Sequence, residues 1–333
     1  MKRVAFLHNV SGVGGTTVTY HVAHMMVEMG NRVLLVDLDP QASLTAMCLS
    51  EERLEALWPS AQRHEQTLLG WIQPVFERGA ARSGGPHVED VCDRLAIVPG
   101  DIGLSSVDEG LLNAWMRAQG QDKGAFHALS ALNNGVSLAM MRHAADVALF
   151  DMGPSLGAIC RTAIASMDGI VTPLAPDLFS TRGLGVLGSV LEDWQHGWQE
   201  RIARNGGALD GLASGRALPL GYVVLQDAMR LSRPVSTFAR WMSGLPREYH
   251  RSVLRDGLSP ASPAEDPACL GILRHYRSLI PLARDARKPM FDLRPADGAI
   301  GSHMQAVARC REDFHALAQA ILDRMDAHGT KNG

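Results

Sequence analysis

Residues 4–17 of the chain read VAFLHNVSGVGGTT. The four apolar residues at the start predict a buried strand, and a helix is expected to begin after the glycines. A strand that leads through a glycine-rich turn into a helix is the layout of a phosphate-binding loop, because the free N–H groups and the dipole of the helix N-terminus attract an anion. This stretch therefore predicts an α/β fold with an anion site near the start of the chain.

The loop departs from the usual phosphate-binding pattern, which is G-x-x-x-x-G-K-[ST]. Gly14 and Thr16 stand at their expected positions, but Asn9 stands where the first glycine is expected. Gly15 stands where the pattern has its lysine. The loop thus keeps residues that shape a phosphate pocket and lacks the charge that would neutralise a bound phosphate.

A second strand follows the first helix closely. Residues 17–29 repeat apolar side chains at helical spacing, and residues 32–37 are a nearly continuous apolar run that ends in Asp37. A strand that is apolar on both faces fits a parallel sheet, and a βαβ unit is right-handed with few exceptions. The acidic turn Asp37-Leu38-Asp39-Pro40-Gln41 then lies at the carboxyl edge of the sheet, where ligands bind in open α/β folds.

The rest of the chain alternates strands and helices. Further strands are predicted at residues 95–99, 146–151, 169–174 and 220–225. Helices are predicted at residues 51–57, 66–76, 124–145, 156–166, 183–203 and 304–325. We therefore expect one domain over residues 1–333, built on a doubly wound, mainly parallel α/β sheet flanked by helices, with a helical excursion at about residues 50–92.

The composition excludes several classes of protein. The 333 residues are 46% hydrophobic and 20% charged, and the net charge of −3 gives no overall attraction to nucleic acid or membranes. The five cysteines form no C-x-x-C pair, so a zinc or iron–sulfur site is not expected. No apolar run approaches the ~20 residues of a membrane span, and no signal peptide is expected. A cytoplasmic protein is the simplest interpretation.

Several motifs occur together in an order that is typical of one family. The loop is followed by Asp37-Leu38-Asp39-Pro40-Gln41 and by an apolar strand that ends in Asp151-Met152-Gly153-Pro154-Ser155-Leu156-Gly157. Residues 171–177 (VTPLAPD), 287–291 (RKPMF) and 296–301 (ADGAIG) add to the match. In this combination the chain resembles the plasmid and chromosome partition branch of the ParA/MinD family of deviant Walker ATPases. The resemblance implies the three-layer fold of P-loop NTPases.

The resemblance also implies a site for ATP or ADP with Mg²⁺. By its motifs, Thr16, Asp37 and Asp151 would hold the metal, and Asp39 would orient the attacking water. The expected nucleotide contacts are Gly12, Val13, Gly14, Gly15, Thr16, Thr17, Pro176, Asp177 and Gln226.

Two lysines of the family's loop are absent from this sequence. The family has one lysine at the Val10 position, which reaches the phosphates of the partner across a dimer, and one at the Gly15 position, which neutralises the β- and γ-phosphates. Loss of one cation aimed at developing charge typically costs about 10²–10³ in rate. We therefore expect weak nucleotide binding and slow or no ATP hydrolysis, unless another cation such as Arg161 or Arg182 compensates.

Partners follow from the same resemblance. Partition proteins of the family form homodimers, act with an adaptor or cargo protein, and bind DNA without sequence preference through a basic C-terminal surface. Residues 229–294 are the basic segment of this chain. Its basic residues are Arg230, Arg233, Arg240, Arg247, Arg251, Arg255, Arg274, Arg277, Arg284, Arg287, Lys288 and Arg294. DNA binding would make the protein nucleoid-associated, whereas the alternative is a solvated set of arginines.

Other functions fit parts of the sequence. A pseudo-ATPase scaffold or regulator could pair with an intact paralogue that supplies the lysines. Residues 153–157 also match the G-x-S-x-G elbow of α/β-hydrolases, with His303 as a partner of Ser155, but Pro154 disfavours the strained elbow backbone. An iron–sulfur reductase would need paired cluster cysteines, for which Cys92 and Cys160 are the spaced candidates.

Two histidines on the first predicted helix could suggest a metal site. His21 and His24 are three residues apart and share one helix face. No third ligand lies nearby in the sequence, so we interpret the pair as part of a polar helix face.

Overall fold

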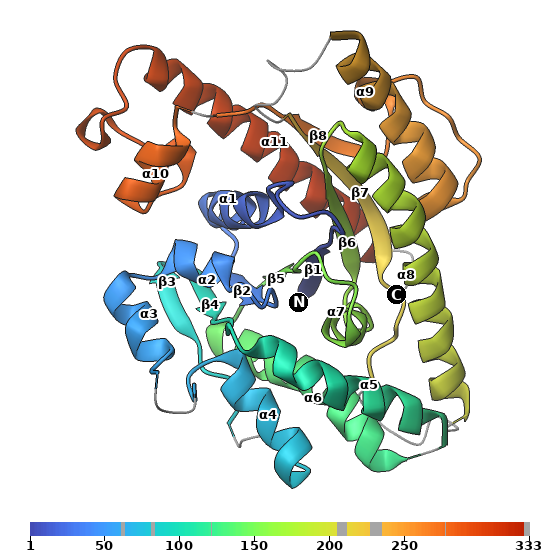
Figure 1. Cartoon of the computed structure of the whole chain (residues 1–333). Coiled ribbons are helices and arrows are strands. Elements are labelled where there is room, and N and C mark those ends of the chain that lie inside the picture. The colour runs from blue at the N-terminus through green and yellow to red at the C-terminus, as the bar shows by residue number, and fades with distance from the viewer. Residues whose placement is uncertain are drawn as a thin grey trace. The chain divides into compact units, whose positions relative to one another are not determined.

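The computed structural model describes residues 1–60, 64–80, 84–120, 122–204, 212–226, 235–276 and 278–329. Its strands form one sheet with the order β3-β4-β2-β5-β1-β6-β7-β8 (Figure 1). They are β1 (Lys2–Phe6), β2 (Val33–Asp37), β3 (Glu89–Cys92), β4 (Leu95–Val98), β5 (Val147–Asp151), β6 (Gly169–Leu174), β7 (Leu218–Leu225) and β8 (Cys269–Leu273). The sheet is mainly parallel, which confirms the predicted fold class.

Apolar runs explain why the central strands form. All five residues of β2 are buried, as are all five of β5, because strands in the middle of a parallel sheet are covered on both faces. β2 pairs in parallel with β4 on one side and with β5 on the other. β3 pairs antiparallel with β4, and the sequence analysis missed it because its residues alternate between half-buried and exposed positions.

The described chain forms two compact units. The first contains residues 1–5, 31–169 and 190–218, and the second contains residues 6–30, 170–189 and 219–333. The single domain expected over residues 1–333 stays a prediction.

Two helices of the first unit lie in the range where a helical excursion was expected. α3 (Glu51–Leu57) and α4 (Leu68–Arg78) lie within residues 50–92, close to the two helices expected there. The other helices of this unit are α2 (Ser43–Cys48), α5 (Asp108–Arg117), α6 (Lys123–His143) and α7 (Ala158–Ile164). α8 (Leu178–Arg204) begins in the second unit and ends in the first. α2 and α5 were not predicted from the sequence.

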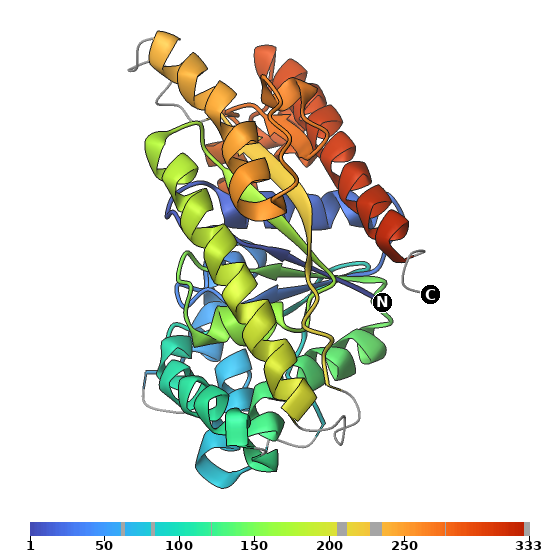
Figure 2. The same cartoon turned by 90° about the vertical axis from the view of Figure 1, so that its right-hand side faces the viewer.

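The second unit contains α1 (Gly15–Glu28), α9 (Val235–Tyr249), α10 (Ile280–Ala286) and α11 (Ser302–Gly329). α1 and α11 lie side by side, as Figures 1 and 2 show in blue and red. An ion pair between Glu28 and Arg311 joins them. A π-helical turn, η4 (His250–Leu254), continues from α9.

The polar face expected for His21 and His24 is wrong for His21. The His21 side chain is 2% exposed and stacks on Phe314 of α11, with ring centroids 4.9 Å apart. Its Nδ1 lies 2.7 Å from the carbonyl oxygen of Thr17, and its Nε2 accepts the N–H of Met290 at 3.0 Å. Burial lowers the pKa of His21 to about 4. The ring is a neutral link between α1 and the C-terminal segment, which sequence spacing could not reveal.

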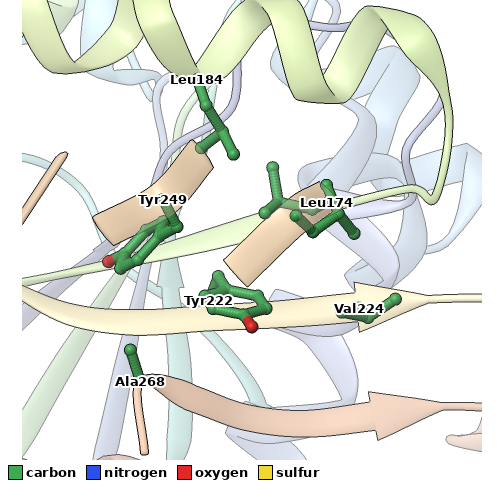
Figure 3. Close-up of a cluster of buried hydrophobic side chains, with 7 residues drawn as sticks. Leu174, Leu184, Tyr222, Val224, Tyr249 and Ala268 are labelled. Carbon is green, nitrogen blue, oxygen red and sulfur yellow. The ribbon is translucent and has the colours of Figure 1, made fainter. Parts of the chain in front are cut away.

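A cluster of apolar side chains joins β6, β7, α8 and α9 in the second unit (Figure 3). Its members are Leu174, Leu184, Tyr222, Val224, Leu245, Tyr249 and Ala268. The rings of Tyr222 and Tyr249 lie 4.9 Å apart between centroids. The cluster fixes α9 and its continuation η4 on the sheet of this unit.

A polar network borders this cluster and centres on His250, which is 1% exposed. Its Nε2 lies 2.8 Å from a carboxylate oxygen of Asp266, and its Nδ1 lies 2.8 Å from one of Asp256. The hydroxyl of Tyr222 donates to the second oxygen of Asp266 at 2.7 Å. Burial opposes the charged imidazolium, but the hydrogen bonds to Asp266 and Asp256 prevail and raise the pKa of His250.

Candidate functional site

The glycine-rich loop lies in the second unit and leads into α1. Gly12 has a φ of 77° and Gly14 a φ of 87°, in the left-handed region that favours glycine. Gly14 is the N-cap of α1 and has no side chain that could cap the first N–H groups of this helix. The first turn of α1 also carries no acidic residue. The backbone therefore presents the features that attract a phosphate, as the sequence analysis expected.

Neighbouring elements of the same unit hold this loop. The N–H of Leu7 donates to the carbonyl oxygen of Val171 on β6 at 3.0 Å. The side chain of Asn9 donates to the carbonyl oxygen of Gly183 on α8 at 2.9 Å. A Cβ at Gly14 would lie 3.6 Å from Leu225, the last residue of β7. The structure therefore brings the loop, the start of α8 and the end of β7 together.

Three predicted nucleotide contacts lie in these neighbouring elements. Pro176 and Asp177 precede α8, and Gln226 follows β7. The carboxylate of Asp177 accepts the N–H of Ser180 at 2.7 Å, which is the geometry of a helix N-cap. The N–H of Gln226 donates to the carbonyl oxygen of Leu273 at 3.0 Å. Both residues thus have a structural role, and their contact with a nucleotide stays a prediction.

The position of the missing lysine is closed by a histidine. A Cβ at Gly15 would lie 2.5 Å from both Cδ2 and Nε2 of His8, a separation that real Cβ atoms do not show. His8 is only 8% exposed, so its ring has little freedom to move away. No sequence pattern singled out His8, because the contact joins a residue of the loop after β1 to the first residue of α1. The loop of this protein is built around glycine at residue 15.

The acidic turn lies in the first unit, at the end of β2. Asp37 is fully buried and pairs in register with Asp151 of β5. One oxygen of Asp37 accepts the N–H of Thr45 at 2.8 Å and its hydroxyl at 2.7 Å, and the other accepts the N–H of Asp39 at 3.2 Å. Burial raises the pKa of Asp37 to about 6, while the bonds from Thr45 oppose that rise. Asp37 therefore fixes the start of α2 in addition to its predicted metal role.

Asp39 and Asp151 complete the acidic edge of this unit. Asp39 is 9% exposed, and its Oδ1 accepts the N–H of Gln41 at 2.9 Å. A Cβ at Gly153 would lie 2.9 Å from that same oxygen, so a larger residue at 153 would displace the carboxylate. The N–H of Leu38 donates to the carbonyl oxygen of Asp151 at 3.0 Å. The turns after β2 and β5 are thus tied to each other within the first unit.

A family model described as an AAA domain (AAA_31) matches residues 1–203. The chromosome-partitioning ATPase Soj of Thermus thermophilus is 28% identical over 218 residues, which cover 66% of this chain and 72% of Soj. The chain belongs to the ParA/MinD family. It spans half the length of two uncharacterized Mycobacterium tuberculosis relatives, to which it is 28% identical over 186 residues, or 56% of this chain.

Solved structures show the same fold. A protein of Corynebacterium diphtheriae, DIP2308, superposes with a TM-score of 0.68 at 22% identity, over 97% of this chain and 98% of that one. A complex of Cyanothece McdA with ATP superposes with a TM-score of 0.61 at 16% identity, over 96% of both chains. The ParA/MinD interpretation accounts for the whole motif at residues 151–157 and for the sequence around it. The hydrolase interpretation accounts only for residues 153–157.

The shared role of Thr16, Asp37 and Asp151 as magnesium ligands stays a prediction. Thr16 lies in the second unit, and Asp37 and Asp151 lie in the first. Hydroxyl and carboxylate oxygens are hard donors of the kind that Mg²⁺ prefers, so the chemistry of each predicted ligand suits that metal. Within the part of the chain that the structure describes, no cluster of three His, Cys, Asp or Glu side chains could hold a metal ion. Mg²⁺ needs few ligands from the protein, because it usually binds through one or two carboxylates together with waters and substrate phosphates.

The arginines considered as substitutes for the lysines have other neighbours. The guanidinium of Arg161 lies 4.2 Å from the ring centroid of Trp115, and burial lowers the pKa of Arg161 to about 10. Arg182 lines a cavity of about 380 Å³ between α8 and α9, together with Trp241 and Arg251. Neither observation gives these arginines a role at the phosphate loop.

The basic segment at 229–294 is only partly described. Arg230, Arg233 and Arg277 lie outside the described residues. Arg251 pairs with Glu248 at 2.8 Å, and Lys288 pairs with Asp297 at 2.8 Å. The exposed basic residues of the described part include Arg240, Arg247, Arg274, Arg284, Arg287 and Arg294. In the described ranges, no helix has the length and apolar character needed to cross a membrane.

Proposed function

We propose that this chain is a ParA-like partition or positioning protein that binds ADP or ATP with Mg²⁺ weakly and hydrolyses ATP very slowly. One observation carries the proposal. The loop keeps the glycine conformations of a phosphate site and the glycine N-cap of its helix, while His8 closes the position of its lysine. Soj, a chromosome-partitioning ATPase, and McdA, which has been solved with ATP, support the functional class.

The chemistry expected of the site separates binding from turnover. The backbone N–H groups of residues 12–17 and the dipole of α1 would bind the phosphates. Thr16, Asp37 and Asp151 would hold Mg²⁺, and Asp39 would orient water. Phosphoryl transfer depends on charge stabilisation, which the absent lysines at Val10 and Gly15 do not supply. Each absent cation removes about 10²–10³ in rate, so the pair removes far more turnover than affinity.

We expect purified protein to bind ADP and ATP in a Mg²⁺-dependent way while its ATP turnover stays at least 10²-fold below that of Soj assayed in parallel. Isothermal titration calorimetry would give the affinities, and release of radiolabelled phosphate would give the turnover. Thr16→Val should remove the Mg²⁺-dependent part of the affinity, because it removes the predicted metal ligand. A turnover equal to that of Soj would contradict the slow-ATPase part of the proposal.

We further propose that the basic segment binds DNA through phosphates. Arg240 and Arg247 are exposed and lie seven residues apart on α9, which places them on one face of that helix. Binding through phosphates releases counterions, so the affinity falls steeply with salt.

For a nonspecific duplex, we expect the affinity to fall at least tenfold between 50 and 200 mM salt, as measured by fluorescence anisotropy. The double variant Arg240→Ala/Arg247→Ala should weaken binding to every duplex and reduce the salt slope by about two, because each phosphate contact contributes about one. Arg309→Ala on α11, an exposed arginine outside the segment, is the matched control. An affinity that does not change with salt would contradict phosphate contacts.

The closed lysine position also favours the second candidate, a pseudo-ATPase scaffold or regulator that pairs with an intact paralogue. The two candidates differ in their partner, because a positioning protein would dimerise with itself when ATP and Mg²⁺ are present. Light scattering of the purified chain with and without ATP–Mg²⁺ separates them. A mass that doubles only with ATP supports the ParA-like homodimer, and a constant monomer mass supports the scaffold.

A further inference from the structure

We propose that His8 replaces the lysine of the phosphate loop as the side chain that contacts the phosphates of a bound nucleotide. The inference rests on the proposed nucleotide site and names a residue that the family's pattern does not use. The ligand class is the phosphate end of a nucleoside di- or triphosphate.

The ring of His8 occupies the path that a lysine side chain at residue 15 would follow. The position of a Cβ on Gly15 lies 2.5 Å from Nε2 of His8 and 3.7 Å from its Cε1. The edge of the ring that carries Nε2 therefore faces the first residue of α1. In the usual pattern the lysine at this position reaches the β- and γ-phosphates. Nε2 of His8 thus lies where the side chain of that lysine would begin.

A side chain at residue 15 and the ring of His8 in its present position cannot occupy the same space. His8 lies two residues after the end of β1 and is 8% exposed, so its ring has little space into which it could move. Any side chain at residue 15 would require the ring to move. The glycine at residue 15 therefore makes room for the histidine at residue 8. The ring of His8 fills the space that the lysine side chain would occupy.

An imidazole at this place can do part of a lysine's work. It donates a hydrogen bond through a ring N–H, and a hydrogen bond to a charged phosphate is worth more than one between neutral groups. It acts beside the N–H groups at the start of α1, which converge on the same anion. The histidine side chain is shorter than that of a lysine and would not reach the γ-phosphate during transfer. A nucleotide would therefore bind but be hydrolysed slowly.

The test is a set of calorimetric titrations with ADP–Mg²⁺ on the full chain and four variants. His8→Phe keeps the ring volume and removes the N–H groups, and we expect its affinity to fall about 10- to 100-fold. Gly15→Lys should bind no better than the wild type, because the new side chain meets the ring of His8. The double variant His8→Ala/Gly15→Lys should bind at least tenfold more tightly than Gly15→Lys alone. His127→Ala, at an exposed histidine of α6, is the matched control and should leave the affinity unchanged.

Each outcome decides between the inference and the function on which it rests. If the wild type binds ADP–Mg²⁺ and His8→Phe binds it equally well or better, His8 fills space only and the inference is overturned while the nucleotide site stands. A Gly15→Lys variant that binds as tightly as the double variant would overturn it as well. If no variant binds nucleotide, the proposed site itself is wrong. Circular dichroism of every variant confirms that a loss of affinity does not reflect a loss of fold.

Discussion

His250→Ala is expected to lower the free energy of unfolding by about 3–5 kcal/mol, the typical cost of removing one partner from a buried ion pair. The imidazole is 1% exposed, and both its nitrogens lie 2.8 Å from carboxylate oxygens, one of Asp266 and one of Asp256. The substitution leaves the carboxylate of Asp266 buried without its cationic partner. Urea unfolding followed by circular dichroism measures the change, and His127→Ala is the exposed control expected to stay within about 0.5 kcal/mol of the wild type.

The same network should make stability depend on pH. The pKa of His250 is raised in the folded protein above the unfolded value of about 6.5. Its stabilising contribution is therefore fully present below pH 6.5 and is lost as the pH rises through the folded pKa. Burial lowers the pKa values of His21 and His24 to about 4 and about 3, so these residues titrate below this window. Stability of the wild type should fall above pH 6.5 more than that of His250→Ala, and parallel profiles would contradict the charged network.

Patterns of burial explain why the sequence predicted the central sheet and the loop. A parallel strand covered on both faces is apolar throughout, so β2 and β5 could be recognised from their letters. β3 lies at the sheet edge and alternates half-buried with exposed residues, which is a weaker signal in four residues. The acids Asp37 and Asp151 could be placed at one edge, because parallel strands of a sheet end on the same side.

Contacts between distant residues explain what the sequence could not predict. The closure of Gly15 by His8 depends on how the loop between these two residues folds back, and nothing in the letters HNVSGVGG specifies it. The three hydrogen bonds that Asp37 accepts depend on Thr45 at the start of α2 and on the turn before it. The sequence shows His21 only as one of two histidines on a helix face. In the structure its ring stacks on Phe314, nearly three hundred residues away in the chain. In each case tertiary packing gives a polar residue its role.

Restored turnover is the largest change in activity that we expect, and it requires three substitutions. The lysines at residues 10 and 15 would supply the two cations that the family's loop carries. Gly15→Lys cannot place its ammonium while the ring of His8 stands 2.5 Å from the new Cβ. The variant Val10→Lys/Gly15→Lys should therefore stay close to the wild-type rate. Adding His8→Ala should raise ATP turnover by at least 10²-fold, since each correctly aimed cation is worth about 10²–10³.

Phosphate release at saturating ATP and Mg²⁺, measured in single-turnover mode, separates chemistry from nucleotide release. Asp39→Ala in the triple-variant background should abolish the gain, because Asp39 is the residue proposed to orient the attacking water. That control distinguishes a restored site from phosphate released by a contaminating ATPase. If Val10→Lys/Gly15→Lys hydrolyses ATP as fast as the triple variant, the ring of His8 moves aside for the lysine. The position of His8 then does not limit ATP turnover. If the triple variant stays slow although it binds ATP tightly, the acidic edge has lost its function together with the two lysines.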